Sequence, residues 1–333
     1  MLKPTFFSLL FSTLVVFSVQ ARDQITTVGS STVYPFATVA AEQFGRTHKN
    51  FKTPVIESTG TGGGMKLFCN GVGSRHPDIT NASRAIKKSE AEKCKKNGVT
   101  PIEVMVGYDG IVLANSKDGK KLSLTRDQLY RATAREVWDG SKFIPNPYKK
   151  WSDIDSSLPD LNIEVMGPPP TSGTRDAYVE LVQHKACKKL GIKKKGDDGY
   201  KARCSAVRED GGYIEGGEND NLIIQKLVGE PRRYGIFGFS FLDNNLDTIQ
   251  GASIDGTKPT FEGIASGKYP VSRSLFFYVK KEHIGTTPGL SEYVKFFASK
   301  SMIGENGATV EKGLIPLQKS EYDALIKKIN DEL

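Results

Sequence analysis

Gly29-Ser30-Ser31-Thr32 is a short segment of small and polar residues, and the chain repeats its design twice more. The second segment is Thr59-Gly60-Thr61-Gly62-Gly63-Gly64 and the third is Thr171-Ser172-Gly173-Thr174-Arg175. Each segment precedes a stretch whose apolar residues recur at helical spacing. The N-terminus of a helix carries unpaired backbone N–H groups and partial positive charge. Three such termini with hydroxyl side chains predict a site for a small oxyanion.

The chain has 333 residues, which is enough for roughly two domains with a sizeable core. Residues 1–21 have the pattern of a secretory signal peptide: a positive charge at Lys3, an apolar run and small residues before a cleavage point after Ala21. The apolar run is too short for a comfortable transmembrane helix. We therefore expect an exported, periplasmic protein.

The formal net charge is +8, and removal of residues 1–21 takes away Lys3 and leaves +7. The lysines are scattered or lie in short runs such as Lys193-Lys194-Lys195. Arginines are not interleaved with aromatic residues, as they are in proteins that read nucleic acids. We therefore expect no nucleic-acid partner, while the positive field favours the capture of anions.

Four cysteines allow three pairings, and an even number in an exported protein suggests two disulfides. We favour Cys69–Cys94 and Cys187–Cys204, because each pair closes a local loop. Each loop contributes roughly 3 kcal/mol in the chain-entropy description. The chain has no CxxC motif and no nearby pair of histidines, so we expect neither a metal site nor a cofactor.

Strand-like runs alternate with helical patterns along most of the chain, which predicts an α/β architecture with largely parallel sheets. Ligands of such folds gather at the carboxyl ends of strands, where the three small polar segments fall. We expect strands at residues 25–28, 53–58, 102–106, 111–114, 163–166 and 275–279. We expect helices after Thr32, from Met65 after the glycine run, at 125–132 from the capping box Thr125-x-x-Gln128, after Thr171 and at 292–299. Residues 191–217 are expected to form a long surface loop.

Five motifs together resemble the phosphate-specific periplasmic binding proteins of bacterial ABC importers. They are residues 28–36, 58–64, 78–84, 107–111 and 171–176, with further matches at 234–239 and 269–273. The resemblance covers nearly the whole mature chain. It implies a two-lobed type II binding-protein fold with the ligand in the cleft between lobes. Lobe one would hold residues 22–106 and 275–333, and lobe two residues 107–274.

The resemblance also implies a role for each loop residue. Ser31 and Thr32 would bind phosphate from the first helix N-terminus, and Thr61 with the Gly62 amide from the second. Ser83 and Arg84 would add a hydroxyl and a guanidinium. From the opposite lobe the ligand residues would be Ser172, Gly173, Thr174 and Arg175. Arginine suits such a site because its fixed donors bind two phosphate oxygens at once.

One branch of this family has an aspartate directly after the loop serine, which accepts the proton of hydrogen phosphate and so excludes sulfate. This chain has Arg84 at that position. It therefore matches the branch of the family whose ligand loops read Ser-Arg and Ser-Gly-Thr-Arg. A phosphate site therefore requires another acceptor. Asp109 is the first candidate and Glu57 is the second.

Other readings remain open at this point. The ligand is phosphate or, alternatively, sulfate, molybdate or a phosphorylated small molecule. An exported phosphatase is less favoured, because the chain has no Gly-x-Ser-x-Gly elbow and residues 60–66 do not fit the P-loop spacing. We therefore expect a non-enzymatic, monomeric receptor that delivers its ligand to an ABC transporter permease in the inner membrane.

Overall fold

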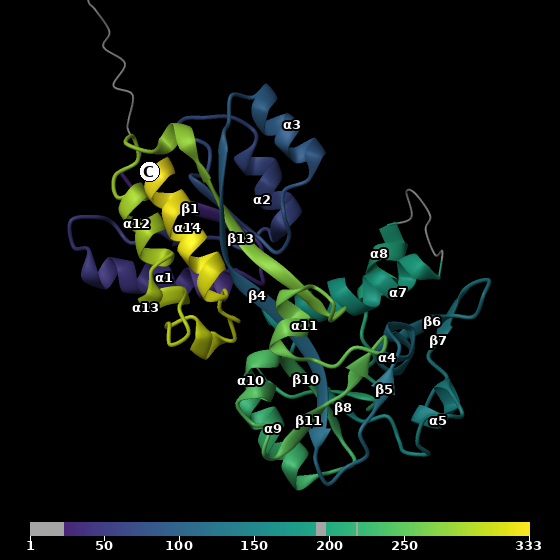
Figure 1. Cartoon of the computed structure of the whole chain (residues 1–333). Helices are drawn as coiled ribbons and strands as arrows, with labels where there is room; N and C mark the ends of the chain where they lie inside the picture. Colours follow the sequence, from purple (N-terminus) through teal and green to yellow (C-terminus); the bar gives the residue numbers. More distant parts are fainter. Residues whose placement is uncertain (1–22, 191–197, 218) are drawn as a thin grey trace, which may run out of the picture.

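The computed structural model describes residues 23–190, 198–217 and 219–333. The predicted signal peptide lies outside the described residues. Figure 1 shows two lobes joined by long strands, with the N-terminal and C-terminal parts of the chain in lobe one and the middle of the chain in lobe two. The described part of the chain contains no helix with the length and apolar character needed to span a bilayer.

Two long strands connect the lobes: β4 (Pro101–Ser116) and β13 (Ser272–Lys280). The other strands of lobe one are β1 (Thr26–Gly29), β2 (Val55–Ile56) and β3 (Ile79–Ala82). Its helices are α1 (Tyr34–Thr47), α2 (Gly60–Phe68), α3 (Lys88–Lys96), α12 (Leu290–Phe297), α13 (Lys300–Ile303) and α14 (Lys319–Glu332), with 3-10 turns at Lys281–His283 and Val310–Lys312.

Lobe two holds the remaining elements. Its strands are β5 (Ser123–Leu124), β6 (Glu136–Trp138), β7 (Phe143–Pro145), β8 (Val165–Gly167), β9 (Tyr213–Glu215), β10 (Tyr234–Gly238), β11 (Ile249–Gly251) and β12 (Ser253–Ile254). Its helices are α4 (Arg126–Thr133), α5 (Trp151–Ile154), α6 (Gly173–Tyr178), a π-helical segment (Val179–Gln183), α7 (His184–Lys189), α8 (Asp198–Ser205), α9 (Asp220–Gly229), α10 (Phe239–Asp243) and α11 (Phe261–Ala265).

The main sheet of the described residues runs through both lobes in the order β2-β1-β3-β13-β4-β10-β8-β9, with β11 also paired to β4. In lobe one, β1 is parallel to β2 and β3. In lobe two, β8 is parallel to β9 and β10. The α/β architecture predicted from the alternating pattern is confirmed. The parallel strands of each lobe end at an edge from which ligand loops emerge.

β4 is one continuous strand, so the prediction of two strands with a break at residues 107–110 is wrong. The break is a local irregularity instead: the register with β13 shifts between Leu275 and Phe276, opposite Gly107. Gly107 has a φ of +153°, and a Cβ there would lie 2.5 Å from the backbone oxygen of Ile315. Glycine therefore lets the strand bend where it passes between lobes. The predicted lobe boundaries fall inside β4 and β13, and their exact positions stay predictions.

α2 begins at Gly60 and includes the glycine run, so the prediction that the helix starts at Met65 after this run is wrong. The reason is packing: a Cβ at Gly64 would lie 2.5 Å from both the Gly29 Cα and the Thr80 Oγ1. A helix without side chains on this face can lie directly against β1 and β3. Glycine costs about 1 kcal/mol in a helix relative to alanine, and here the close contact offsets that cost.

The structure contains both favoured disulfides. Cys69–Cys94 joins the end of α2 to α3, and Cys187–Cys204 joins α7 to α8. The expected long loop at 191–217 contains α8 and β9, and it is irregular only at 206–212 and 216–217 of its described residues. Residues 191–197 of that segment lie outside the described residues. The disulfide and strand pairing organise a stretch whose glycines and lysines indicated only a loop.

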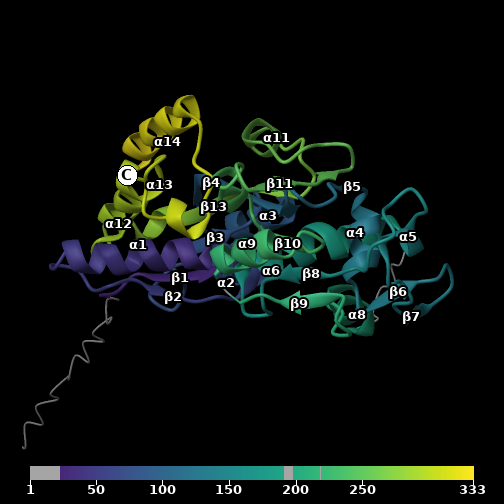
Figure 2. The same ribbon diagram turned by 90° about the horizontal axis from the view of Figure 1, so that it is seen from below.

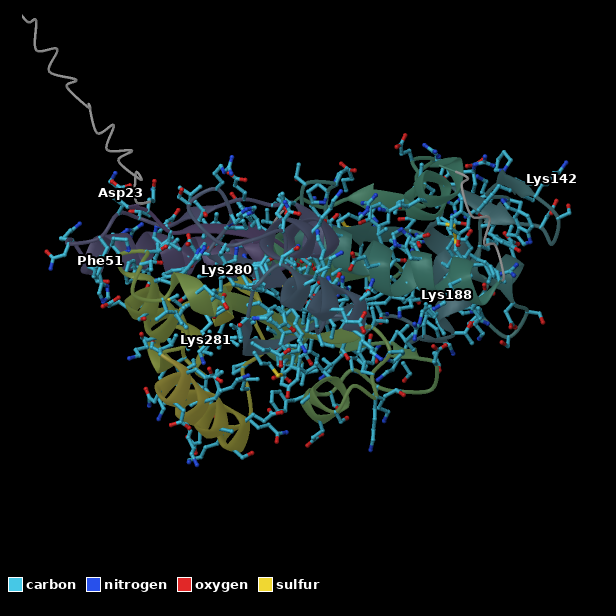
Figure 3. All side chains as sticks on the ribbon, turned by 90° about the horizontal axis from the view of Figure 1, so that it is seen from above. Asp23, Phe51, Lys142, Lys188, Lys280 and Lys281 are labelled. Atoms are coloured by element: carbon cyan, nitrogen blue, oxygen red, sulfur yellow. A yellow bond between two sulfur atoms is a disulfide. The ribbon has the colours of Figure 1, made fainter. Side chains whose placement is uncertain are left out.

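α12 of the C-terminal segment packs against α1 (Figure 2). The Phe44 ring of α1 meets Tyr293 of α12 edge to face at 5.4 Å, and the Tyr293 hydroxyl donates to the Ala37 oxygen. The C-terminal segment also contacts β4, because the Tyr108 hydroxyl of β4 donates to Glu321 of α14 at 2.5 Å. In Figure 3, Asp23 and Phe51 mark one end of the elongated molecule and Lys142 the other.

Gly64→Ala is expected to destabilise the protein by about 1–3 kcal/mol, because the new methyl group enters the contact between α2 and β1. Gly63→Ala is the matched control. Its Cβ would meet only Thr59 at 3.5 Å, and alanine at this helical position is expected to be neutral or to stabilise by up to about 1 kcal/mol. Denaturant unfolding measures both. Equal stability of the two variants would contradict the packing argument.

Candidate oxyanion-binding site

A cleft of about 720 Å³ lies between the lobes. Its lining comes mainly from loops that follow the carboxyl ends of strands in both lobes. The lining residues are Ser31, Thr32, Tyr34, Pro35, Phe36, Ser58, Asp109, Thr171, Ser172, Gly173, Thr174, Asn219, Asp220, Asn221, Gly238, Phe241, Glu311, Lys312 and Gly313. Two of the three small polar segments, 29–32 and 171–175, therefore line the same cleft from opposite lobes.

Helices α1, α6 and α9 begin at this cleft. Ser172 caps α6, because its Oγ accepts a hydrogen bond from the Thr174 amide at 3.2 Å. Asn219 caps α9 in the same way by accepting from the Asn221 amide at 3.0 Å. A capping hydroxyl accepts with its oxygen and keeps its own proton to donate. The three helix ends give the cleft partial positive charge suited to an anion.

The ligand loops of the two lobes are in contact. A Cβ at Gly173 would lie 2.9 Å from the backbone oxygen of Ser31 and 3.3 Å from the Thr32 Cα. Glycine at 173 is therefore required for the approach of α6 to the loop that follows β1. An anion at this point would receive donors from both lobes at once.

Arg273 is a largely buried cation beside the cleft, and no role was predicted for it from the sequence. It lies on β13 directly opposite Asp109 of β4. Its guanidinium donates to the Asp109 Oδ2 at 3.3 Å, the Glu180 Oε2 at 2.6 Å and the Thr32 Oγ1 at 2.6 Å. Because the Thr32 oxygen accepts this bond, its own hydroxyl proton can be donated into the cleft.

Asp109 is a buried carboxyl group that lines the cleft. Burial raises the pKa of Asp109, the positive charge and hydrogen bond of Arg273 act in the opposite direction, and Glu180 raises it further. Within the described residues, the Oδ1 of Asp109 has no hydrogen-bond partner, while Oδ2 accepts from Arg273. The carboxyl group can therefore accept one further proton-bearing group.

The second loop set lies outside the cleft lining. Thr61 and Ser83 contact each other: the Ser83 amide donates to the Thr61 Oγ1 at 3.1 Å, and their hydroxyl oxygens are 3.0 Å apart. Gly62 is exposed in the first turn of α2, and Glu57 is exposed after β2. These residues follow the carboxyl ends of β2 and β3, whereas Ser31 and Thr32 follow the strand between them, β1.

The two predicted ligand arginines have protein partners. Arg84 forms a bidentate ion pair with Glu90 of α3 at 2.9 and 2.7 Å. Arg175 donates to the Pro168 oxygen at 2.9 Å, and its guanidinium lies 4.6 Å from the centre of the Tyr213 ring. Neither side chain lines the cleft in this structure, and their ligand roles stay predictions.

Arg273, Asp220 and Lys312 lie in or beside the cleft and were not predicted from the sequence. Arg273 belongs to the matching motif at 269–273, but the resemblance implied no role for it. Asp220 follows Gly216-Gly217 and the N-cap residue Asn219. This segment is a further small polar stretch before a helix, and that pattern could have predicted its place at the cleft. Lys312 is in a 3-10 turn of the C-terminal segment, and nothing in its surroundings in the sequence indicated a position at the cleft.

The described residues contain no group of three or more His, Cys, Asp or Glu side chains that could hold a metal ion. The cleft lining, as far as the chain is described, includes neither histidine nor cysteine. Its donors are hydroxyls, backbone amides, amide side chains and the ammonium group of Lys312. This chemistry suits reversible anion binding.

The fold and site together define a two-lobed binding protein. A family model described as a PBP superfamily domain matches residues 18–301. The chain belongs to this superfamily of periplasmic binding proteins, and the family and fold predicted from the motifs are confirmed.

The chain is 30% identical to Protein SphX of Synechococcus elongatus over 313 residues, which cover 92% of this chain and 81% of that protein. It is 27% identical to the phosphate-binding protein PstS of Staphylococcus saprophyticus, covering 91% and 83%. Its structure is similar to that of a possible phosphate binding protein from Planctomyces limnophilus, with a TM-score of 0.75, 27% identity and coverage of 94% and 100%.

Gly173→Ala is expected to weaken binding of phosphate, the ligand that the motifs imply, by about tenfold or more, because the methyl group separates the two ligand loops. Gly229→Ala is the control, since a Cβ at this end of α9 would meet nothing within 4 Å. Titration calorimetry compares the variants. Unchanged affinity in Gly173→Ala would show that the loops do not act together on the ligand.

Proposed function

We propose that the protein captures inorganic phosphate outside the cytoplasm and delivers it to the permease of an ABC importer in the inner membrane. The observation that carries the proposal is the contact between two helix N-terminal loops across the cleft, at Gly173 and Ser31. Relatives named as phosphate-binding proteins support the choice of ligand. The protein acts as a monomer in the periplasm, after removal of residues 1–21.

The proposed ligand site combines donors from both lobes. Ser31 and Thr32 donate from the loop before α1, and Ser172, Gly173 and Thr174 donate from the start of α6. Thr61, Gly62, Ser83, Arg84 and Arg175 complete the proposed set, with a change of side-chain position required for the two arginines. Buried anions require such dense donation, because desolvation of an unpaired charge is expensive.

Asp109 distinguishes phosphate from sulfate in this proposal. Its Oδ1 accepts the proton that hydrogen phosphate carries and fully ionised sulfate lacks. Arg273 stabilises the ionised carboxylate from the other side at 3.3 Å. Sulfate at the same position would meet an unpaired negative oxygen, which repels it.

The mechanism is capture without chemistry. Members of the superfamily are substrate-binding proteins, and a cleft lined by hydroxyls and backbone amides holds an anion without offering an activated nucleophile. The lobes close around phosphate by bending at β4 and β13, the strands that connect them. The permease then recognises the closed shape, and its binding releases the ligand.

Titration calorimetry on the mature chain, unfolded and refolded to remove carried ligand, tests the proposal directly. We expect tight one-to-one binding of phosphate and no heat with sulfate. Equal binding of sulfate, or binding of neither anion, would exclude a phosphate receptor and leave only the fold established.

Asp109→Asn is expected to reduce the preference for phosphate over sulfate by about 10- to 100-fold, because an amide offers sulfate a donor. The preference of the unaltered protein should also fall as pH is lowered, because the raised pKa of Asp109 means that the carboxyl group gains its proton at less acidic pH than an ordinary aspartate.

Competition between the two anions across a range of pH measures both effects. Asp220→Asn is the control, since Asp220 is the other buried carboxyl group of the cleft and accepts from the Gly238 amide at 3.3 Å. A loss of preference in Asp220→Asn and not in Asp109→Asn would assign the proton acceptor to Asp220.

A further inference from the structure

Arg273 contacts elements of both lobes at the point where the lobes are connected. Its strand, β13, pairs with β4 along its whole length, and Asp109 stands directly opposite Arg273. Figure 1 shows both strands running between the lobes. The side chains of Arg273 and Asp109 are only 8% and 11% exposed. The pair therefore joins the two strands that connect the lobes.

The other two bonds of Arg273 reach outward from the hinge. Nη2 donates to Thr32, on the ligand loop of lobe one, at 2.6 Å. Nη1 donates at 2.6 Å to Glu180, on the π-helical segment that directly continues α6 of lobe two. Because the guanidinium is planar and its donors are fixed in direction, one side chain sets the distance between these two elements.

The elements that Arg273 connects are the same two that meet at the ligand position. Thr32 adjoins Ser31, whose backbone oxygen limits residue 173 to glycine. Glu180 is in the continuous helical stretch that begins with Gly173. Movement of α6 away from the loop before α1 must therefore stretch the bond to Thr32 or the bond to Glu180.

We infer that Arg273 is a positioning residue that holds the cleft closed, by connecting Thr32 of lobe one to Glu180 of lobe two across the hinge. This inference rests on the proposed function, because closure is what retains the ligand. Opening breaks the hydrogen bond of Arg273 to Thr32 or its ion pair with Glu180, and it leaves the Arg273–Asp109 pair intact. The bonds to Thr32 and Glu180 thus favour the closed form, and an anion that also bridges the loops adds to the same preference.

A simpler role for Arg273 is neutralisation of the buried Asp109 carboxylate alone. The two roles differ at Glu180, whose side chain is 55% exposed and needs no partner for its own stability. Removal of its charge leaves the Arg273–Asp109 pair unchanged. An effect of Glu180 on closure is therefore specific to the connecting role.

The experiment compares Glu180→Gln and Arg273→Lys with the unaltered protein and with a control, Glu164→Gln. Glu164 also forms a carboxylate–guanidinium pair in lobe two, with Arg233 at 2.8 Å, and it does not line the cleft. Release of radiolabelled phosphate into excess unlabelled phosphate gives the dissociation rate. Small-angle X-ray scattering without phosphate gives the radius of gyration.

We expect Glu180→Gln to release phosphate about fivefold faster than the control variant, as loss of one half-exposed ion pair allows. Arg273→Lys keeps the charge but loses the fork, and we expect release about tenfold faster or more. Without phosphate, both variants should have a larger radius of gyration than the control variant. The thermal unfolding midpoint of Glu180→Gln should equal that of Glu164→Gln.

Release and scattering of Glu180→Gln that match those of Glu164→Gln would overturn the inference. If the unaltered protein does not bind phosphate, the proposed function fails by that result alone. The scattering comparison without phosphate then decides the inference separately: an unchanged radius in Glu180→Gln contradicts it, and a larger radius supports it.

Discussion

The approach of two helix N-termini across a cleft is the constraint on which the rest of this structure depends. Each first turn has backbone N–H groups that the helix itself does not pair, and their positive ends repel each other unless an anion lies between them. Glycine at 173 permits that approach, because a Cβ there would lie 2.9 Å from the backbone oxygen of Ser31. The surrounding architecture supplies the rigidity needed to aim both ends at one point: α12 holds α1, and the Ser172 hydroxyl caps α6.

The hinge strands explain how such a site can open and close. β4 pairs with β10 and β11 of lobe two, and β13 pairs with β3 of lobe one and with β4, so the two halves of the sheet share a backbone instead of a flexible linker. Gly107 permits the local bend, and the Arg273–Asp109 pair lies two residues further along the paired strands. The same two strands thus carry the hinge, a buried ion pair and the proposed proton acceptor.

Much of this arrangement could be predicted from the sequence, because local signals and their order along the chain decide it. The strand at 25–28, the capping box at Thr125 and the loop before α6 appear close to where they were expected. The errors arose where tertiary packing overrides local pattern. Gly64 is in a helix because β1 lies against it, and residues 107–110 continue a strand because β13 pairs with them. Arg273 was missed because its partners come from residues 32, 109 and 180, which no local pattern connects.

Several predicted ligand residues illustrate the same limit. Sequence motifs indicate that Arg84 and Arg175 follow the ligand loops, but a motif does not give the direction of a long side chain. In this structure Arg84 pairs with Glu90, and Arg175 stacks on Tyr213. Their participation in binding requires them to exchange these partners for the anion.

A crystal structure of the mature chain grown with phosphate tests the central claim most directly. The account predicts one phosphate between the loops, with the Thr32 hydroxyl and the amides of Gly173 and Thr174 donating to it and the Oδ1 of Asp109 facing its protonated oxygen. Phosphate bound elsewhere, or a closed cleft whose two helix N-termini hold no anion, would contradict it.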